Sequence, residues 1–148
     1  MSGPYLRDSF SISCDPRDVD LDVVTEFLAT SYWAAAIPRD VVARSVRGSL
    51  CFSLCEGERQ IGFARVISDR ATFAYLADVF VVREYRGRGL ATWLIECVMA
   101  HPDLQGLRRW MLATRDAHAL YEKAGFTALS HPEVFMELRD PDIYRREA

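Results

Sequence analysis

A turn that carries two glycines and two arginines, residues 86–89, constrains this chain most because of the segments on either side of it. The run of β-branched and aromatic residues before it, 75–82, predicts a strand, and apolar residues recur at helical spacing from Leu90 to Val98 after it. Glycines let the backbone of such a turn approach a ligand, and the first N–H groups of the following helix lack partners within the helix. The helix dipole and the arginine charges favour an anion there. The sequence therefore predicts a diphosphate site at this turn.

Two common diphosphate motifs do not fit. The dinucleotide fingerprint needs three glycines in G-x-G-x-x-G spacing, and the P-loop ends in Gly-Lys-Ser/Thr, which is not found in this sequence. The segment Arg86-x-x-Gly89-x-Ala91 instead resembles the Arg/Gln-x-x-Gly-x-Gly/Ala signature of the GNAT superfamily, the acyl-CoA-dependent N-acyltransferases. Residues 119–126, Ala-Leu-Tyr-Glu-Lys-Ala-Gly-Phe, resemble that family's later Leu-Tyr-x-x-x-Gly-Phe motif. The resemblance covers residues 75–126, about a third of the chain.

The hydrophobic periodicity predicts alternating strands and helices along one domain, residues 1–148. Asp15 followed by a proline predicts the start of the first helix, Gly48 the end of the second, and Asp116 the cap of a short last helix. The predicted strands are 9–14, 50–55, 60–67, 73–82, 110–113, 126–129 and 135–138. This order is what the GNAT resemblance implies: a three-layer α/β fold whose mixed central β-sheet is flanked by helices and splayed where the cofactor enters.

Composition excludes several other classes. Half of the 148 residues are hydrophobic, which argues against disorder, and a net charge of −3 gives no global reason to bind nucleic acid. No apolar run approaches the ~20 residues of a membrane span, and the first ten residues lack the core of a signal peptide, so we expect a cytoplasmic protein with no membrane contact. The four cysteines are then expected to be reduced and to act as small buried hydrophobes, with no metal site.

Two residues are candidates for the chemistry that acyl transfer to an amine requires. Tyr121 lies at the tyrosine of the second motif, where the resemblance implies a general acid for the leaving thiolate; the alternative is a tyrosine that only packs on the sheet. Asp78 lies among apolar residues of a strand, where we expect it to share a face with Leu76 and Phe80. It is either a base for the amine, a counter-ion for a cationic substrate, or the ion-pair partner of an arginine such as Arg65. The three histidines are expected to be structural or exposed.

The remaining candidates bind substrates. The resemblance implies that the turn holds the pyrophosphate of acetyl-CoA, the co-substrate, and that the preceding strand pairs with its pantetheine arm through backbone groups. The residues assigned to this cofactor are Val79, Phe80, Val81, Arg86, Gly87, Arg88, Gly89, Leu90, Ala91 and, at a strand end, Thr114. Tyr32 and Trp33 lie between the first two helices, where they either line the acceptor site or pack in the core.

The sequence thus predicts an acetyl-CoA-dependent N-acetyltransferase that acts on a primary amine of a small molecule, a protein or a peptide, as a monomer or a homodimer. The alternative is a non-catalytic acyl-CoA sensor on the same fold. Nucleic-acid binding through the arginines is disfavoured because the chain has no basic surplus. The sequence leaves the identity of the acceptor open.

Overall fold

A mixed six-stranded sheet in the order β1-β2-β3-β4-β5-β6 forms the centre of the protein, in a computed structural model that describes residues 4–145. Neighbouring strands are antiparallel from β1 to β5, and β5 and β6 are parallel. The strands are β1 (Tyr5–Arg7), β2 (Phe10–Ser13), β3 (Leu50–Glu56), β4 (Arg59–Ser68), β5 (Phe73–Val81) and β6 (Arg109–Leu112). Strand β1, which pairs with β2, was not predicted from the sequence.

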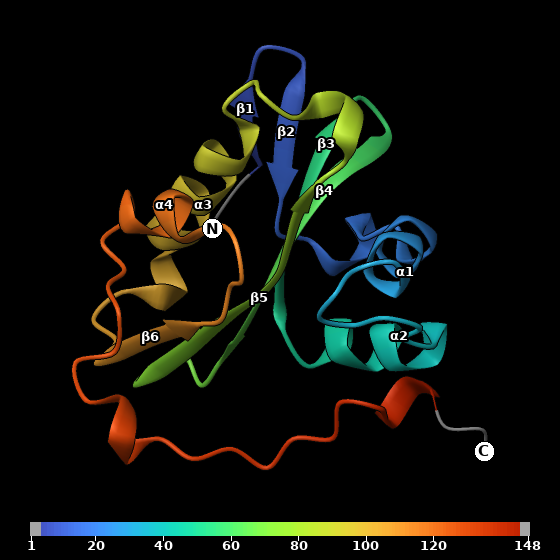
Figure 1. The fold of residues 1–148 in the computed structure, drawn as a ribbon. Helices are drawn as coiled ribbons and strands as arrows, with labels where there is room; N and C mark the ends of the chain where they lie inside the picture. Colours follow the sequence, from blue (N-terminus) through green and yellow to red (C-terminus); the bar gives the residue numbers. More distant parts are fainter. Residues whose placement is uncertain (1–3, 146–148) are drawn as a thin grey trace.

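Helices cover both faces of this sheet. Figure 1 shows α1 and α2 on one face and α3 and α4 on the other, which is the predicted three-layer arrangement. The helices are α1 (Leu21–Ala29), α2 (Arg39–Arg47), α3 (Leu90–Ala100) and α4 (His118–Glu122). Short 3₁₀ turns occupy Pro16–Asp18, Arg83–Tyr85, Pro102–Leu104, Pro132–Val134 and Ile143–Arg145.

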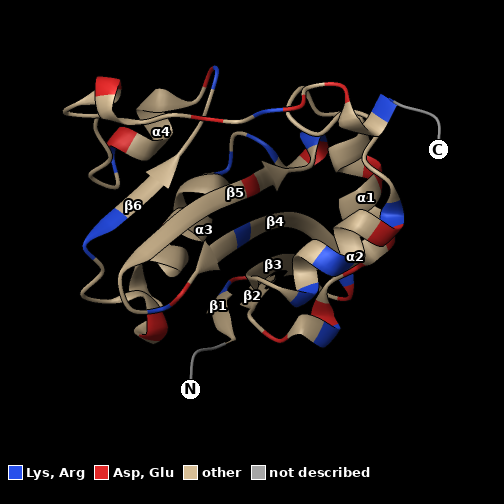
Figure 2. Ribbon diagram, turned by 90° about the horizontal axis from the view of Figure 1, so that it is seen from below, with Lys and Arg blue, Asp and Glu red and all other residues tan. Residues whose placement is uncertain are grey.

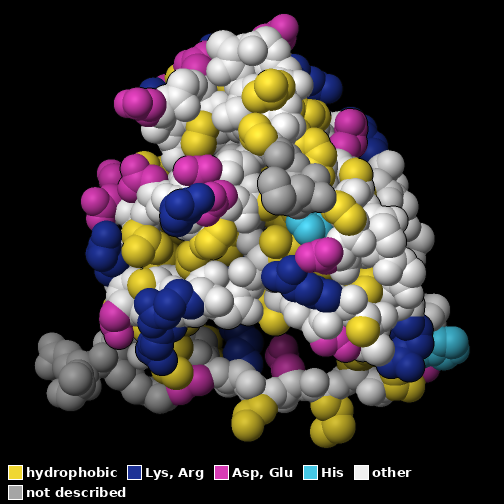
Figure 3. Space-filling view, turned by 180° about the vertical axis from the view of Figure 1, so that it is seen from behind, with side chains coloured by type: hydrophobic (Ala, Val, Ile, Leu, Met, Phe, Trp, Pro, Cys, Tyr) yellow, Lys and Arg dark blue, Asp and Glu magenta, His cyan; other side chains and the backbone are white. Residues whose placement is uncertain are grey.

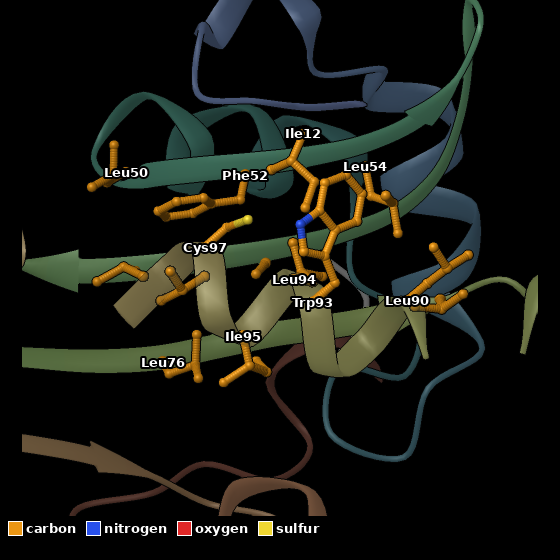
Figure 4. Packing of buried hydrophobic residues seen from close by; sticks show 14 of the residues in the cluster. Ile12, Leu50, Phe52, Leu54, Leu76, Leu90, Trp93, Leu94, Ile95 and Cys97 are labelled. Atoms are coloured by element: carbon orange, nitrogen blue, oxygen red, sulfur yellow. The ribbon is translucent and has the colours of Figure 1, made fainter. Parts of the chain in front are cut away.

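The sheet buries a separate apolar cluster against each helical layer. Figure 4 shows the larger one, in which Leu94 and Ile95 of α3 pack against Phe52 and other strand residues. On the opposite face, α1 and α2 pack against Phe63 and Phe80. Each fully buried side chain of this size contributes about 1.5–3 kcal/mol relative to exposure. Burial on both faces fixes which side of each strand faces which helix, and so fixes the side chains at the site.

Two predicted helix starts were wrong. Asp15 caps only the 3₁₀ turn, and α1 begins after Asp20, whose carboxylate accepts the N–H groups of Asp22 and Val23. Helix α4 follows Ala117 without a side-chain cap in that helix, so Asp116 does not cap it. The predicted end of α2 at Gly48 is confirmed.

The two predicted closing strands were also wrong. Residues 126–129 and 135–138 belong to no strand. Within the described chain, β6 is the last strand of the sheet, and neither segment pairs with its outer edge. Met136 is 98% exposed and Leu138 is fully exposed. The alternating pattern that predicted a strand at 135–138 is present in the sequence, but no strand of the described chain pairs with this segment.

Strands β5 and β6 diverge after a short paired stretch. Residues Phe73 to Leu76 pair with Arg109 to Leu112, and the pairing ends there. Further along β5, Asp78 has a left-handed backbone (φ +55°) and, with Val79, opposes the single residue Ala64 of β4. This is a β-bulge, which bends a strand and redirects its side chains. The predicted splay in the sheet therefore lies where β5 bulges away from β6.

Candidate active site

A cavity of about 370 Å³ lies at the divergence of β5 and β6. Its walls come from β4 and β5, from the loop that follows α1, from α2, from the segment after β6, from α4 and from the C-terminal segment. Six residues predicted from the sequence line it together: Tyr32, Trp33, Asp78, Val79, Thr114 and Tyr121. Segments up to 89 positions apart, from Tyr32 to Tyr121, thus converge on one space.

Tyr121 presents a neutral phenol to this cavity. Its side chain is 9% exposed, and its ring makes an edge contact with Phe126 at 6.1 Å. Burial raises the pKa of Tyr121 to about 12, and the nearby Tyr32 and Asp116 act in the same direction. No other group of residues 4–145 makes a hydrogen bond with its hydroxyl. The phenol is therefore protonated at neutral pH and available to donate to a bound molecule.

Asp78 is held by two donors on the wall of the cavity. Its Oδ2 accepts from Nε of Arg65 at 2.7 Å, and its Oδ1 accepts from Nε1 of Trp33 at 2.9 Å. The side chains of Arg65 and Asp78 are only 16% and 9% exposed, and Arg65 also donates to Ser49 at 3.0 Å. Figure 2 shows the acidic position on β5 beside the basic position on β4. Of the roles left open by the sequence, pairing with Arg65 is the one seen directly.

The expected face of Asp78 was partly wrong. Leu76 packs in the cluster under α3, whereas Phe80 packs in the cluster under α1 and α2. The bulge at Asp78 inserts an extra residue, so strict alternation fails between positions 76 and 80. Asp78 thus meets Arg65 and Trp33 rather than the apolar cluster of Leu76.

Tyr32 and Trp33 form a half-exposed aromatic wall. Their rings are in edge contact at 5.1 Å, and the exposed fractions are 45% and 41%. The Tyr32 hydroxyl accepts the backbone N–H of Arg115 at 2.9 Å, while the Arg115 guanidinium lies 3.9 Å from the ring centroid. The loop after α1 is therefore joined to the segment after β6 across the mouth of the cavity.

Among the residues that sequence reasoning missed are Tyr144, which lines this cavity, and Arg115, which holds Tyr32 beside it. Arg115 lies outside both family motifs, and Tyr144 reaches the cavity wall from a C-terminal segment that forms no strand or α-helix. The strand end before Arg115 was a usable signal, because residues that follow adjacent strands meet at one edge of a sheet. Nothing in the sequence places Tyr144.

The glycine turn is open to solvent at the start of α3. Gly87 and Gly89 have φ values of +80° and +75°, and a Cβ at either position would meet nothing within 4 Å. Gly89 is the N-cap of α3 and provides no side-chain cap, so the first N–H groups of the helix point into open space. Arg86 and Arg88 are exposed, and Nε of Arg86 donates to the carbonyl of Val81 at 3.0 Å. The residues present therefore fit a bound diphosphate.

A second hollow, of about 840 Å³, is lined by Arg86 of this turn and borders the cavity. It shares Tyr32 and Trp33 with the cavity, and four arginines lie along it: Arg59, Arg83, Arg86 and Arg115. Glu26 and Glu84 also line this hollow, and Glu84 pairs with Arg59 at 3.0 Å, but the arginines outnumber the carboxylates and favour an anionic ligand there.

The backbone between the turn and the cavity has one unpaired edge. Phe80 and Val81 pair with β4 on one side, while β6 pairs with β5 only as far as Leu76. Val79 lines the cavity, and Leu90 is buried behind the turn, with Ala91 half-buried beside it. The hydroxyl of Thr114 already accepts one hydrogen bond, from the N–H of Ala117 at 3.1 Å, and its own proton is left to donate.

The histidines do not contribute to this cavity. His118 and His131 are exposed, and His101 is buried elsewhere, where burial lowers its pKa. Among residues 4–145 no group of three or more His, Cys, Asp or Glu side chains is arranged so that it could hold a metal ion. In the same range no helix combines the length and apolarity needed to cross a membrane.

Comparisons with known proteins agree on the family. The family model described as an acetyltransferase (GNAT) domain matches residues 47–128, more than half of the chain. A curated protein of Gibberella zeae, assigned as an acetyltransferase, is 30% identical over 142 residues, covering 80% of this chain and 79% of that protein.

Solved structures show the same fold. A protein of Xanthomonas campestris pv. campestris, assigned to the GNAT family as an acetyltransferase, has a TM-score of 0.90 and 48% identity, over 93% of this chain and 97% of that one. Glucosamine-6-phosphate N-acetyltransferase from Arabidopsis thaliana has a TM-score of 0.63, with 16% identity over 88% of this chain and 97% of that one. The second likeness is one of fold alone.

Proposed function

Because the chain belongs to the GNAT family of acetyltransferases, we propose that it transfers an acetyl group from acetyl-CoA to a primary amine. The observation that carries this proposal is the pairing of an open cationic turn with a cavity that holds a neutral phenol, whose hydroxyl bonds to no other residue of the described chain. The two are joined by a hollow lined with arginines. The acceptor is a small molecule or an amino group of a protein or peptide.

We propose that the turn and the free edge of β5 hold the donor. Acetyl-CoA would supply an activated thioester. The N–H groups at the start of α3, with Arg86 and Arg88, fit its diphosphate, since backbone N–H groups and fixed positive charge both favour an anion. The backbone of residues 79–81 offers hydrogen bonds along the unpaired edge, and Thr114 can donate its hydroxyl proton from the opposite side.

Tyr121 is proposed to assist the departing sulfur. A phenol with a pKa of about 12 keeps its proton at neutral pH, and a free thiol in a protein has a pKa of ~8.5. The phenol is the weaker acid, so its hydrogen bond stabilises the thiolate and full proton transfer follows only as the acceptor ammonium releases its own proton. The general acid expected from the motif would thus act first as a hydrogen-bond donor to the thiolate.

Asp78 is proposed to position the acceptor rather than to act as the base. Both of its oxygens already accept hydrogen bonds, from Arg65 and Trp33. A carboxylate held in this way orients the Trp33 ring on the cavity wall, while Arg65 compensates its charge. If it were the base, Asp78→Asn would lower turnover; a positioning role raises the Michaelis constant instead.

The cavity wall favours an amine carried on an apolar or aromatic group. Tyr32, Trp33, Tyr75 and Tyr144 all line it, and aromatic faces bind apolar groups and cations. We also propose that the chain acts as one domain in the cytoplasm, as its composition suggests.

The test is incubation with acetyl-CoA and a panel of amines, with free-thiol release and product mass as readouts. Aromatic and alkyl amines are expected to be acetylated faster than polar amines of equal basicity. Binding of acetyl-CoA without turnover of any amine would favour the sensor, and no binding at all would refute the placement of the donor. Gly89→Val is the matched control, because it blocks the turn while leaving Tyr121 and the cavity intact.

A further inference from the structure

Arg115 is held in place on the aromatic wall but has no acidic partner. Its guanidinium lies over the Tyr32 ring, 3.9 Å from the centroid, and its backbone N–H donates to the Tyr32 hydroxyl at 2.9 Å. Among residues 4–145 no carboxylate forms an ion pair with it. A guanidinium that lies over a ring keeps its N–H donors at its edge, where they can bind a carboxylate or a phosphate in pairs. Arg115 therefore presents a fixed set of cationic donors to a ligand.

The hollow that Arg115 lines carries more positive than negative charge. Four arginines and two glutamates line it, and one arginine–glutamate pair at 3.0 Å cancels a charge of each sign. Arg83, Arg86 and Arg115 then remain against Glu26 alone. Basic and acidic side chains are interspersed on the face that Figure 3 shows. A concave surface with an excess of one sign attracts the opposite charge, so this hollow favours an anion.

The donor does not account for the charge at Arg115. Of the turn that we assign to the diphosphate, only Arg86 lines the hollow. Much of the remaining wall comes from α1 and the loop after it, and α1 covers the face of the sheet opposite α3 (Figure 1). A ligand bound by Arg115 therefore approaches from the α1 side. That side leads to the cavity through Tyr32 and Trp33, which line both spaces.

The cavity itself offers an acceptor little net charge. The only carboxylate described above on its β5 wall, Asp78, is paired with Arg65 at 2.7 Å, and both side chains are largely buried. Binding energy for the acceptor must then come from the part of the molecule that does not react. An acceptor whose amine lies in the cavity reaches Arg115 if its other end extends past Tyr32 into the hollow.

Building on the proposed acetyl transfer, we propose that the acceptor carries an oxyanion, a carboxylate or a phosphate, at the end remote from its amine. Arg115 binds this group, and Arg83 adds charge from the other side of the hollow. The spacer between amine and oxyanion packs on the rings of Tyr32 and Trp33. Arg115 is thus the residue that selects the acceptor, while the chemistry remains that of the cavity.

The test compares acceptors that differ only in charge at the remote end. Two such pairs are para-aminomethylbenzoate with its carboxamide and γ-aminobutyrate with its carboxamide, at equal concentrations of unprotonated amine. In at least one pair, kcat/KM for the carboxylate is expected to exceed that for the amide by about 10-fold or more, because hydrogen bonds to charged groups are the stronger ones. A phosphonate on the same spacer shows which oxyanion is preferred, and a preference for either over the amide supports the proposal.

Variants of Arg115 separate recognition from a structural role. Arg115→Met keeps an apolar side chain on Tyr32 and removes the charge, so it is expected to abolish the preference for the carboxylate and to change kcat/KM for the amide little. A structural role alone would lower both values alike. Arg115→Lys is expected to restore part of the preference, because it keeps the charge but not the planar fork. Arg47→Met, at the exposed end of α2, is the matched control and is expected to keep the preference. A preference that survives Arg115→Met would overturn the proposal.

A binding measurement distinguishes failure of this proposal from failure of the proposed function. Hydrocinnamate, an aromatic carboxylate without an amine, is titrated by calorimetry into the protein saturated with CoA. Saturable binding is expected, about 10-fold or more weaker in Arg115→Met and unchanged in Arg47→Met, whether or not any amine is acetylated. No binding, or binding that CoA displaces, would overturn the proposal, because the oxyanion would then have no site or would share that of the donor. Equal acetylation of carboxylates and amides would overturn it too, but would leave the proposed function standing.

Discussion

Removal of the Asp78 charge should destabilise the protein through the arginine that it leaves behind. The Arg65–Asp78 pair is 2.7 Å long, and the two side chains are 16% and 9% exposed. Removing one partner of a buried pair costs about 3–5 kcal/mol, because the remaining charge stays buried without compensation. In Asp78→Asn the amide oxygen still accepts a hydrogen bond, and Arg65 keeps its bond to Ser49, so the expected loss is about 2–3 kcal/mol.

The assay is a double-mutant cycle in urea with Asp78→Asn, Arg65→Met and both changes together. The double variant removes the uncompensated charge, so it should be more stable than the sum of the single losses predicts, by about 1–3 kcal/mol. Glu84→Gln is the control, because the Arg59–Glu84 pair is 59% and 64% exposed. Losing an exposed pair should cost less than about 1 kcal/mol. Single losses that add to within about 0.5 kcal/mol would refute the coupling.

Three further predictions follow from local geometry. Gly89→Val should fold, since nothing lies within 4 Å of its Cβ, although a φ of +75° is strained for valine. The variant should not bind acetyl-CoA in calorimetry, and a near-normal affinity would mean that the diphosphate lies elsewhere. Gly62→Ala should lower the urea midpoint markedly, because its Cβ would lie 2.8 Å from Leu54 Cδ2 and 2.9 Å from the Phe80 carbonyl, and an unchanged midpoint would contradict this packing. Burial raises the pKa of Cys51 from 9.0 to about 12, so the thiol ionises more readily in the unfolded chain. Stability should therefore fall by up to about 1.4 kcal/mol per pH unit as the pH rises through this window, and Cys51→Ala should show a shallower slope in denaturation at successive pH values.

Sequence patterns predicted correctly those turns and helix ends that depend on a few adjacent residues. The hairpin between β3 and β4, the end of α2 at Gly48 and the strand–turn–helix around Gly89 each depend on a few adjacent residues. The family resemblance, rather than local signals, predicted that the loop after α1, strand β5 and helix α4 lie around one site. The chemistry at those positions remains a proposal.

The sequence could not predict features that depend on distant neighbours. The bulge at Asp78 lies where β5 still pairs with β4 but no longer pairs with β6. No residue pattern in the sequence predicts a bulge at this position. The segment 135–138 alternates as a strand does, but pairing depends on a neighbouring edge that the pattern does not reveal, and in the structure the segment belongs to no strand. Tyr144 reaches the cavity, and Arg115 reaches Tyr32, only through the tertiary fold.

Turnover of the Tyr121→Phe variant tests the central claim most directly. The substitution deletes one hydroxyl and keeps the ring against Phe126, so the fold and the diphosphate turn should be unaffected. If the phenol assists the leaving thiolate, thiol release from acetyl-CoA at saturating amine should fall by roughly 10² or more, with acetyl-CoA affinity unchanged within a few-fold. Turnover equal to that of the unmodified protein would contradict the account, because the unbonded hydroxyl in the cavity would then have no part in the reaction.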